Sequence, residues 1–76
     1  MKVRDMKPGD IFECAYGHED NIITGVFESA EPDGGWTKIQ FRFMGGKSKT
    51  MYDSRDYENA ELEVIGHVQS QEGGED

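Results

Sequence analysis

Three side chains of this 76-residue chain are of the types that bind zinc: Cys14, His18 and His67. Cys14 and His18 have a spacing seen in some zinc sites, and His67 could join them from a later segment. A structural zinc site takes four ligands in a closed tetrahedron, and one cysteine with two histidines falls short of that unless a carboxylate completes the set. We therefore expect no metal site, and we expect Cys14 to be a small residue of the core or of a strand edge.

Two pairs of acidic residues raise the question of general acid–base catalysis: Glu19 with Asp20, and Glu61 with Glu63. Such catalysis needs two carboxyl groups in contrasting environments, whereas the first pair falls in a polar loop and the second on one solvated strand face. The glycine-rich run at 45–48 lacks the first half of a Walker phosphate loop. Because no motif places a nucleophile beside a base, the sequence predicts a non-enzymatic protein without cofactors.

Short β-type runs separated by turn clusters must position any site in this chain. The sequence has four valines, five isoleucines, one leucine and ten glycines, a composition that suits strands and tight turns rather than helices. The alternation of these runs predicts five strands, at residues 11–16, 22–29, 36–44, 48–52 and 61–68. We expect one short helical turn within residues 53–60. Residues 1–68 then form one small domain, and residues 69–76 a disordered acidic tail.

The turn that precedes the first predicted strand carries a resemblance. The run Met6-Lys7-Pro8-Gly9-Asp10-Ile11-Phe12 leads a proline-glycine turn into an apolar strand. With five short strands and a helical turn before the last, residues 3–68 resemble the small SH3-like β-barrels, at the level of fold only. The resemblance implies an all-β binding module, because such barrels serve in peptide binding, nucleic-acid binding and complex assembly. A five-stranded OB-type barrel is the alternative.

Charge is unevenly distributed along the chain. The net charge is -8, which opposes general affinity for DNA, RNA or anionic membranes. Residues 17–35 carry five acids and no base, residues 36–55 carry five bases and one acid, and residues 56–76 carry seven acids and no base. With one cysteine and no long apolar stretch, we expect a cytoplasmic protein without a membrane anchor. Partner binding or weak self-association would help so small a core.

Residues 36–44 show the clearest alternation in the sequence. Ile39, Phe41 and Phe43 fall on one side of the predicted strand, and Trp36, Lys38, Gln40, Arg42 and Met44 fall on the other. This pattern is typical of a half-buried antiparallel strand. We expect the phenylalanine side to face the core.

The hairpin that follows predicts a cluster of positive charge. If Gly45 and Gly46 are the two loop residues, Arg42 lies opposite Lys49; a three-residue loop would set Arg42 against Thr50 instead. Like charges that oppose each other across a strand pair destabilise it by up to about 1 kcal/mol. A bound anion or an acidic partner surface would relieve this repulsion.

The preceding hairpin extends the predicted surface. A register that sets Val26 opposite Ile39 in the interior brings Phe27 and Ile23 to the outer side. The predicted partner-binding face then consists of Ile23, Phe27, Trp36, Lys38, Gln40, Arg42 and Lys49. Aromatic anchors beside cations are common in interaction surfaces. In the alternative reading, strong bending of a small barrel buries Phe27 and Ile23 in the core.

Three functions fit these patterns. The first is a protein-binding adaptor or regulator, such as an accessory protein of a bacterium or bacteriophage, that uses this aromatic and basic face. The second is nucleic-acid binding through the same face, with Trp36 stacking on a base. The third is mimicry of nucleic acid by the acidic segments, which would block a basic groove of a host protein.

Overall fold

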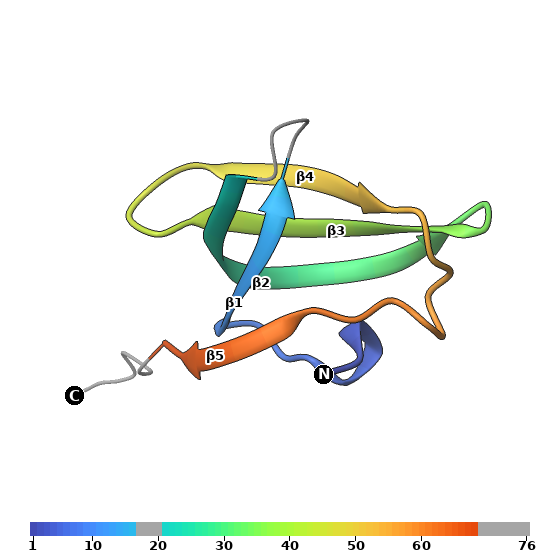
Figure 1. Ribbon diagram of the computed structural model, residues 1–76, viewed down its shortest axis with the longest axis horizontal. Helices are drawn as coiled ribbons and strands as arrows, with labels where there is room; N and C mark the ends of the chain where they lie inside the picture. The colour runs from blue at the N-terminus through green and yellow to red at the C-terminus, as the bar shows by residue number, and fades with distance from the viewer. Residues whose placement is uncertain (17–20, 69–76) are drawn as a thin grey trace.

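A computed structural model describes residues 1–16 and 21–68, and these residues form an all-β fold with five antiparallel strands in one sheet (Figure 1). The strands are β1 (Asp10–Tyr16), β2 (Asn21–Asp33), β3 (Trp36–Phe43), β4 (Ser48–Asp53) and β5 (Glu63–His67). Their order in the sheet is β4-β3-β2-β1-β5. All five predicted strands are present, with shifts at their ends.

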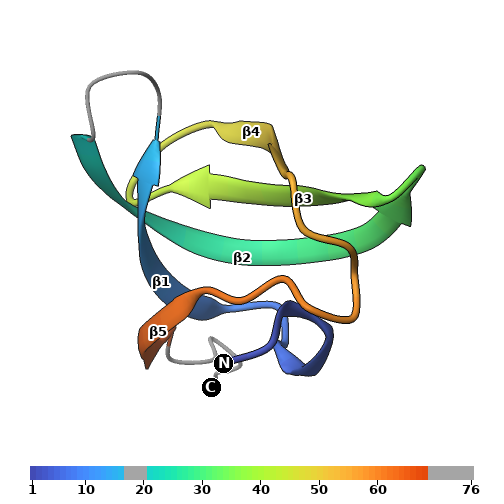
Figure 2. The same cartoon turned by 45° about the vertical axis from the view of Figure 1, so that its right-hand side comes forward.

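The sheet bends because β2 is long and is shared between two halves. Its first half pairs with β1, from Asn21 opposite Tyr16 to Val26 opposite Ile11. Its second half pairs with β3, and the two ladders overlap only at Gly25 and Val26. A β-bulge between Phe27 and Ser29 adds a bend there. As a result β1 crosses the long β2–β3 pair steeply, and both halves enclose a common interior (Figures 1 and 2).

The sheet is not closed into a barrel: β4 and β5 are its two edges, and no ladder in the described residues joins them. The connection from β4 to β5 passes across this open side (Figure 2). The predicted short helical turn within residues 53–60 is a single hydrogen-bonded turn, and a short helix that was not predicted lies before β1. The 3-10 helix η1 (Val3–Asp5) precedes β1, whereas the β4–β5 connection contains a turn in which the Ala60 N–H donates to the Asp56 carbonyl at 2.9 Å.

The core is built around a pair of phenylalanines. The Phe12 and Phe41 rings meet edge to face with their centroids 5.7 Å apart, and both side chains are fully buried. Phe43 adds a second edge-to-face contact with Phe41. Gly25 lies beneath the pair, where a Cβ atom would come within 2.9 Å of both Phe12 and Phe41. This close approach explains why β2 carries glycine at the point where its two ladders overlap.

The N-terminal segment covers one end of this core. The Val3 N–H donates to the Ala60 carbonyl at 2.9 Å, and the Leu62 N–H donates to the Met1 carbonyl at 3.0 Å. Val3, Ala60 and Leu62 are all buried, and Met6 packs with them. Residues 1–6 and 60–62 therefore act together as one wall of the interior, although they are far apart in the sequence.

The alternation predicted for β3 is confirmed. Ile39 and Phe41 are fully buried, Phe43 packs against the core, and Trp36 and Gln40 are exposed. Thr37 shares the inner face, and its hydroxyl donates to the Arg55 carbonyl at 2.9 Å. Successive side chains of a strand point to opposite faces, so the alternating sequence gives β3 one buried and one exposed side.

Both predicted hairpin registers were wrong. In the β3–β4 hairpin Arg42 opposes Ser48, and Lys49 opposes Phe41. The loop consists of residues 44–46, because the Phe43 N–H donates to the Lys47 carbonyl at 3.1 Å and the Gly46 N–H donates to the Phe43 carbonyl at 2.9 Å. Gly45 adopts a positive φ of 72° in this loop. This φ suits glycine at the third position of a tight turn.

In the β2–β3 hairpin Val26 opposes Arg42 rather than Ile39, and Phe27 opposes Phe41 rather than Lys38. Most of this difference comes from the turn: Asp33 pairs with Trp36, so the loop holds only Gly34 and Gly35, whereas the predicted register leaves residues 30–35 in the loop. The bulge next to Phe27 inserts one further residue, which turns the earlier β2 residues to the other face of the sheet. Sequence alternation alone does not reveal an inserted residue of this kind.

Candidate functional site

The outer face of β3 unites four of the predicted partner-binding residues. Trp36, Lys38, Gln40 and Arg42 alternate along the outer side of the strand. Trp36 is 51% exposed, which leaves half of a large indole in water. The structure adds Tyr52, which lies opposite Lys38 on β4 and is 54% exposed. We call Trp36, Lys38 and Tyr52 the aromatic patch.

The other three predicted members of this face lie elsewhere. Phe27 is 4% exposed and belongs to the core, and Ile23 packs against the core as a half-buried residue. Lys49 opposes Phe41, so its position belongs to the inner side of the hairpin. The predicted outward orientation of Phe27 and Ile23 was wrong because the bulge changes the register, and the alternative reading placed them correctly.

The predicted basic cluster is dispersed over two sides of the sheet, and two of its cations form ion pairs. Lys38 forms an ion pair with Glu31 of β2, with a distance of 3.9 Å between Nζ and Oε2. Glu28 accepts a hydrogen bond from the Ser48 hydroxyl at 3.2 Å on the same side of the sheet. Arg55 turns to the opposite side, where it binds Asp53. The cations of the sequence run at 36–55 therefore do not gather into one cluster.

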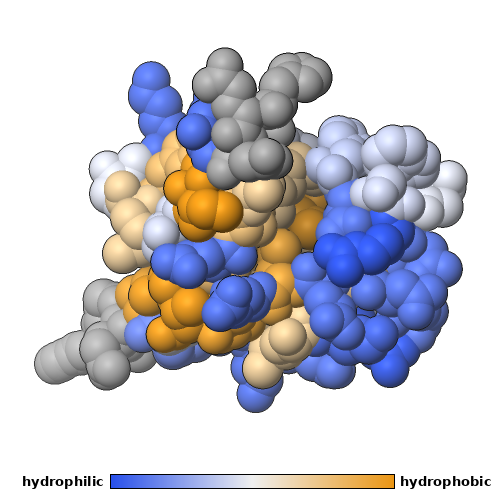
Figure 3. All heavy atoms as spheres, viewed as in Figure 1, coloured by the Kyte–Doolittle hydropathy of each residue, from blue (hydrophilic) through white to orange (hydrophobic). Residues whose placement is uncertain are grey.

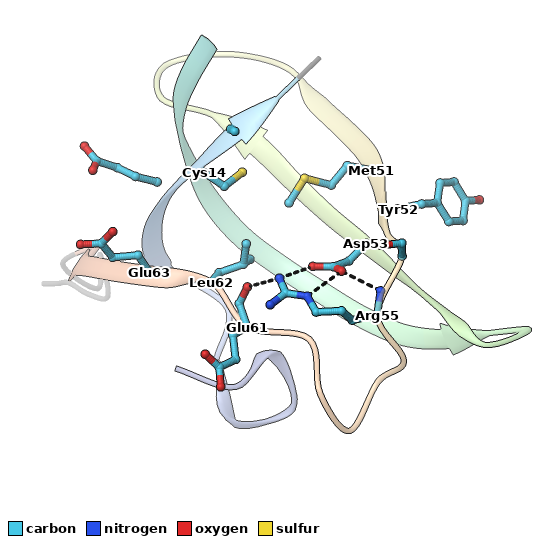
Figure 4. Close-up of a pocket in the computed structure, with 11 residues that line it drawn as sticks. Cys14, Met51, Tyr52, Asp53, Arg55, Glu61, Leu62 and Glu63 are labelled. Atoms are coloured by element: carbon cyan, nitrogen blue, oxygen red, sulfur yellow. Dashed lines mark hydrogen bonds and ion pairs between the residues drawn. The ribbon is translucent and has the colours of Figure 1, made fainter. Parts of the chain in front are cut away.

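A groove lies on the open side of the sheet, between the β4 edge and the segment that leads into β5 (Figure 4). We call it the edge groove, and its volume is about 400 Å³. It is lined by Glu13, Cys14, Ala15, Met51, Tyr52, Asp53, Ser54, Arg55, Glu61, Leu62 and Glu63. Met51, Cys14 and Leu62 point toward one another across it, whereas the Tyr52 ring points away (Figure 4). Hydrophobic residues also surface in the middle of this face of the molecule (Figure 3).

A three-residue clip closes one end of the edge groove. The Arg55 guanidinium donates to both Asp53 carboxylate oxygens, at 3.0 Å from Nε and 2.7 Å from Nη2. Nη2 also donates to the Glu61 carbonyl at 3.0 Å, which ties β4 to the β5 side. The Arg55 hydrogen bonds hold the pKa of Asp53 below its ordinary value of 3.8, and the same bonds raise the pKa of Arg55.

The thiol of Cys14 lies in this groove in its protonated form. Burial, together with the negative charge of Asp53, raises the pKa of Cys14 above its ordinary value of 9.0. A thiol with a raised pKa is a poor nucleophile and a poor metal ligand. Within residues 1–16 and 21–68, no three His, Cys, Asp or Glu side chains are grouped to hold a metal ion. His18, Glu19 and Asp20 lie outside the described residues, as does the predicted acidic tail.

A second cavity, of about 460 Å³, lies on the other side near the ends of β1 and β5. Pro8, Gly9, Val26, Phe27, Glu28, Arg42, His67 and Val68 line it. His67 is held by Asp10, with 2.8 Å between Nδ1 and Oδ1, and the Lys7 N–H donates to the other Asp10 oxygen at 2.9 Å. Burial alone would raise the pKa of Asp10, but the bonds from Lys7 and His67 outweigh it and hold that pKa below 3.8.

Comparison of the chain with protein families, with curated proteins and with solved structures gives no match. Among the described residues there is also no helix long and apolar enough to cross a bilayer. Function must therefore be inferred from the aromatic patch and the two cavities.

Sequence reasoning missed the Tyr52 half of the aromatic patch and the whole edge groove. The exposure of Tyr52 could have been predicted from the sequence, because side chains alternate along β4 and Met51 is half-buried. The edge groove joins residues 13–15, 51–55 and 61–63. No local pattern brings these three segments together, because only the bend of the sheet does so.

Proposed function

We propose that this protein is a small non-enzymatic binding module that recognises another protein through the aromatic patch. The observation that carries the proposal is the exposure of Trp36 and Tyr52, at 51% and 54%, on one face of a two-stranded ribbon. Tryptophan and tyrosine are enriched among the residues that dominate protein interfaces. Their rings lose little conformational entropy on binding, so they supply contact area at low cost.

The geometry around Lys38 also suits a protein ligand. Lys38 neighbours Trp36 along β3 and Tyr52 across the β3–β4 ladder, and Glu31 lies opposite it on the β2 side. The ion pair with Glu31 draws the Lys38 side chain toward β2, so its charge is balanced beside the two rings while its methylene stem adds apolar surface. A flat aromatic surface with a balanced charge pair at its rim resembles the anatomy of a protein interface.

Local charge favours a protein over a nucleic acid. On the outer side of the sheet, Lys38 and Arg42 lie close to acidic residues of β2: Glu28, Glu31 and Asp33. This surface has no excess of positive charge with which to hold phosphates. Mimicry of nucleic acid would instead depend on the acidic segments at 17–35 and 56–76, and it makes no use of the exposed rings.

We also propose that the fold is a small SH3-like barrel that is left open between β4 and β5. The support is the strand order together with the long, bent β2 that is shared between two halves of the sheet. The turn of residues 7–10 that leads into β1, where the Asp10 N–H donates to the Lys7 carbonyl at 3.0 Å, adds to the likeness.

Site-specific photo-cross-linking tests the proposed binding surface. A benzophenone amino acid replaces Trp36 in one variant and Ile65, which is 49% exposed on β5, in a matched control. Both variants are irradiated in lysate of the native host, with and without prior nuclease treatment. We expect one discrete protein adduct at position 36 that is absent at position 65. Equal labelling at both positions, or loss of the adduct with nuclease, would contradict the proposal.

A further inference from the structure

The β4 strand leaves half of its backbone hydrogen-bonding groups unused. The Phe43 N–H donates to the Lys47 carbonyl at 3.1 Å, so Phe43 and Lys47 are a hydrogen-bonded pair of the hairpin. Hydrogen-bonded pairs then recur at every second residue. By the alternation of an antiparallel ladder, the N–H and C=O groups of Thr50 and Tyr52 point away from β3. Nothing in the described part of the chain pairs with this edge. An unpaired edge of this kind is a template for another strand.

The edge groove lies directly beside these unused groups. Its β4 wall is formed by residues 51–54, and its far wall by residues 13–15 and 61–63. Its floor is apolar, because Cys14, Met51 and Leu62 face one another there (Figure 4). A strand added to β4 would place every second side chain on this floor.

The far wall of the groove carries acidic residues that are only partly neutralised, and the Glu63 side chain extends from this wall away from the apolar floor (Figure 4). Glu13 lies directly opposite Glu63 in the β1–β5 ladder. Among the described residues neither of these two carboxylates has an ion-pair partner, and Glu61 on the same wall reaches only Lys2, at 3.6 Å. Two like charges that oppose each other across a strand pair destabilise it. A positively charged side chain from outside would remove this repulsion.

From these three observations we infer a second binding surface, which adjoins the aromatic patch at Tyr52 but uses the backbone of that residue and not its ring: the edge groove accepts an extended, lysine- or arginine-bearing segment of another protein as an added strand on β4. Backbone hydrogen bonds to Thr50 and Tyr52 supply affinity, and pairing of the incoming cations with Glu13 and Glu63 selects a basic sequence. The overall charge of -8 attracts such a segment at long range.

Charge also distinguishes this occupant from two others. The chain's own residues 69–76 contain three acids and no base, so they would add to the repulsion at the far wall. A second copy of the chain also carries a charge of -8, and two such molecules repel each other. A basic segment of a different protein is the occupant that the groove complements.

The test is a titration of the full-length, isotope-labelled protein with a ten-residue peptide of alternating lysine and valine, followed by nuclear magnetic resonance. Two control peptides have the same length: one with N-methylated amides at alternate residues and the same charge, and one with glutamate in place of lysine. We expect the amides of Thr50 and Tyr52 to shift and to gain protection from hydrogen exchange. We expect at least fivefold weaker binding of the N-methylated peptide, since one lost hydrogen bond corresponds to a factor of about five.

A double variant, Glu13→Gln/Glu63→Gln, tests the charge selection. We expect it to melt at or above the wild-type temperature and to bind the lysine peptide several-fold more weakly. Equal binding of the N-methylated or the glutamate peptide would overturn the inference, as would shifts confined to the Trp36 indole. A free protein that is already dimeric, with Thr50 and Tyr52 protected, would assign the edge to a second copy and also overturn it. Because the Trp36 indole reports on the aromatic patch alone, the two binding surfaces are judged separately.

Discussion

The two faces of β3 differ more than any other neighbouring surfaces in the molecule. On the inner face Thr37, Ile39 and Phe41 are completely buried, whereas on the outer face Trp36 is half exposed. Successive residues of one strand therefore contribute either to the core or to the surface. The comparison teaches that folding and binding can be altered separately here, because side chains of opposite faces do not share contacts.

The largest effect is expected from removal of an inner-face ring. Phe41→Ala deletes the central member of two edge-to-face contacts, and we expect it to lower the free energy of unfolding by about 3 to 5 kcal/mol. In a domain of this size such a loss leaves little folded protein at room temperature. Chemical denaturation of the variant beside the wild type measures the change. A loss under 1 kcal/mol would mean that the inner face is not the core.

A smaller effect on the same face is expected from Gly25→Ala. The added methyl group would lie 2.8 Å from the Phe41 ring and 2.9 Å from the Phe12 ring, so one of the rings must move. Overpacking of this kind costs about 1 to 3 kcal/mol. Gly46→Ala is the matched control, because its Cβ atom would have ordinary contacts, the nearest at 3.5 Å. Similar melting temperatures for both variants would show that the core around Gly25 is looser than described.

The contact between Asp10 and His67 predicts a pH-dependent effect away from both faces. The pKa of Asp10 lies below 3.8 in the folded protein, so its contribution to stability is complete above the unfolded-state pKa and is lost as the pH falls through the folded-state value. We expect Asp10→Asn to be less stable than the wild type at pH 6, by about 1 kcal/mol. The difference should shrink below pH 3.5. A difference that stays constant between pH 6 and pH 3 would contradict this assignment.

The all-β class, the five strands and the inner face of β3 could be predicted because each depends on local alternation and on turn residues. The sequence left two positions open for Phe27, on the outer face or in the core, because the bulge beside it changes the register without any change in composition. The prediction of a basic cluster was wrong for a related reason. That Glu31 of β2 lies opposite Lys38 can be predicted only once the register is known. That Arg55 turns toward Asp53 on the other side depends on the tertiary structure.

The edge groove was beyond sequence reasoning because it depends on long-range contacts. Its walls meet only after β2 bends and after Arg55 ties β4 to the Glu61 carbonyl. By contrast, the exposed position of Trp36 followed from alternation alone. Local patterns thus predicted part of the aromatic patch, whereas tertiary packing created the groove.

The smallest effect on stability is expected from the outer face. Trp36→Ser and Tyr52→Ser each remove a ring that is about half exposed, and surface substitutions of this kind change the free energy of unfolding by about 0.5 kcal/mol or less. Thermal melting of both variants measures this. A loss comparable to that of Phe41→Ala would show that the rings support the fold rather than a binding surface.

The central claim, that the outer face binds a protein while the inner face holds the fold, is tested most directly by one affinity measurement. The protein cross-linked at position 36 is purified, and its binding to the wild type and to Trp36→Ser is measured by calorimetry. We expect the variant to remain folded and to bind about 30-fold more weakly, which corresponds to the loss of one dominant interface residue of about 2 kcal/mol. A folded variant with wild-type affinity would contradict the account.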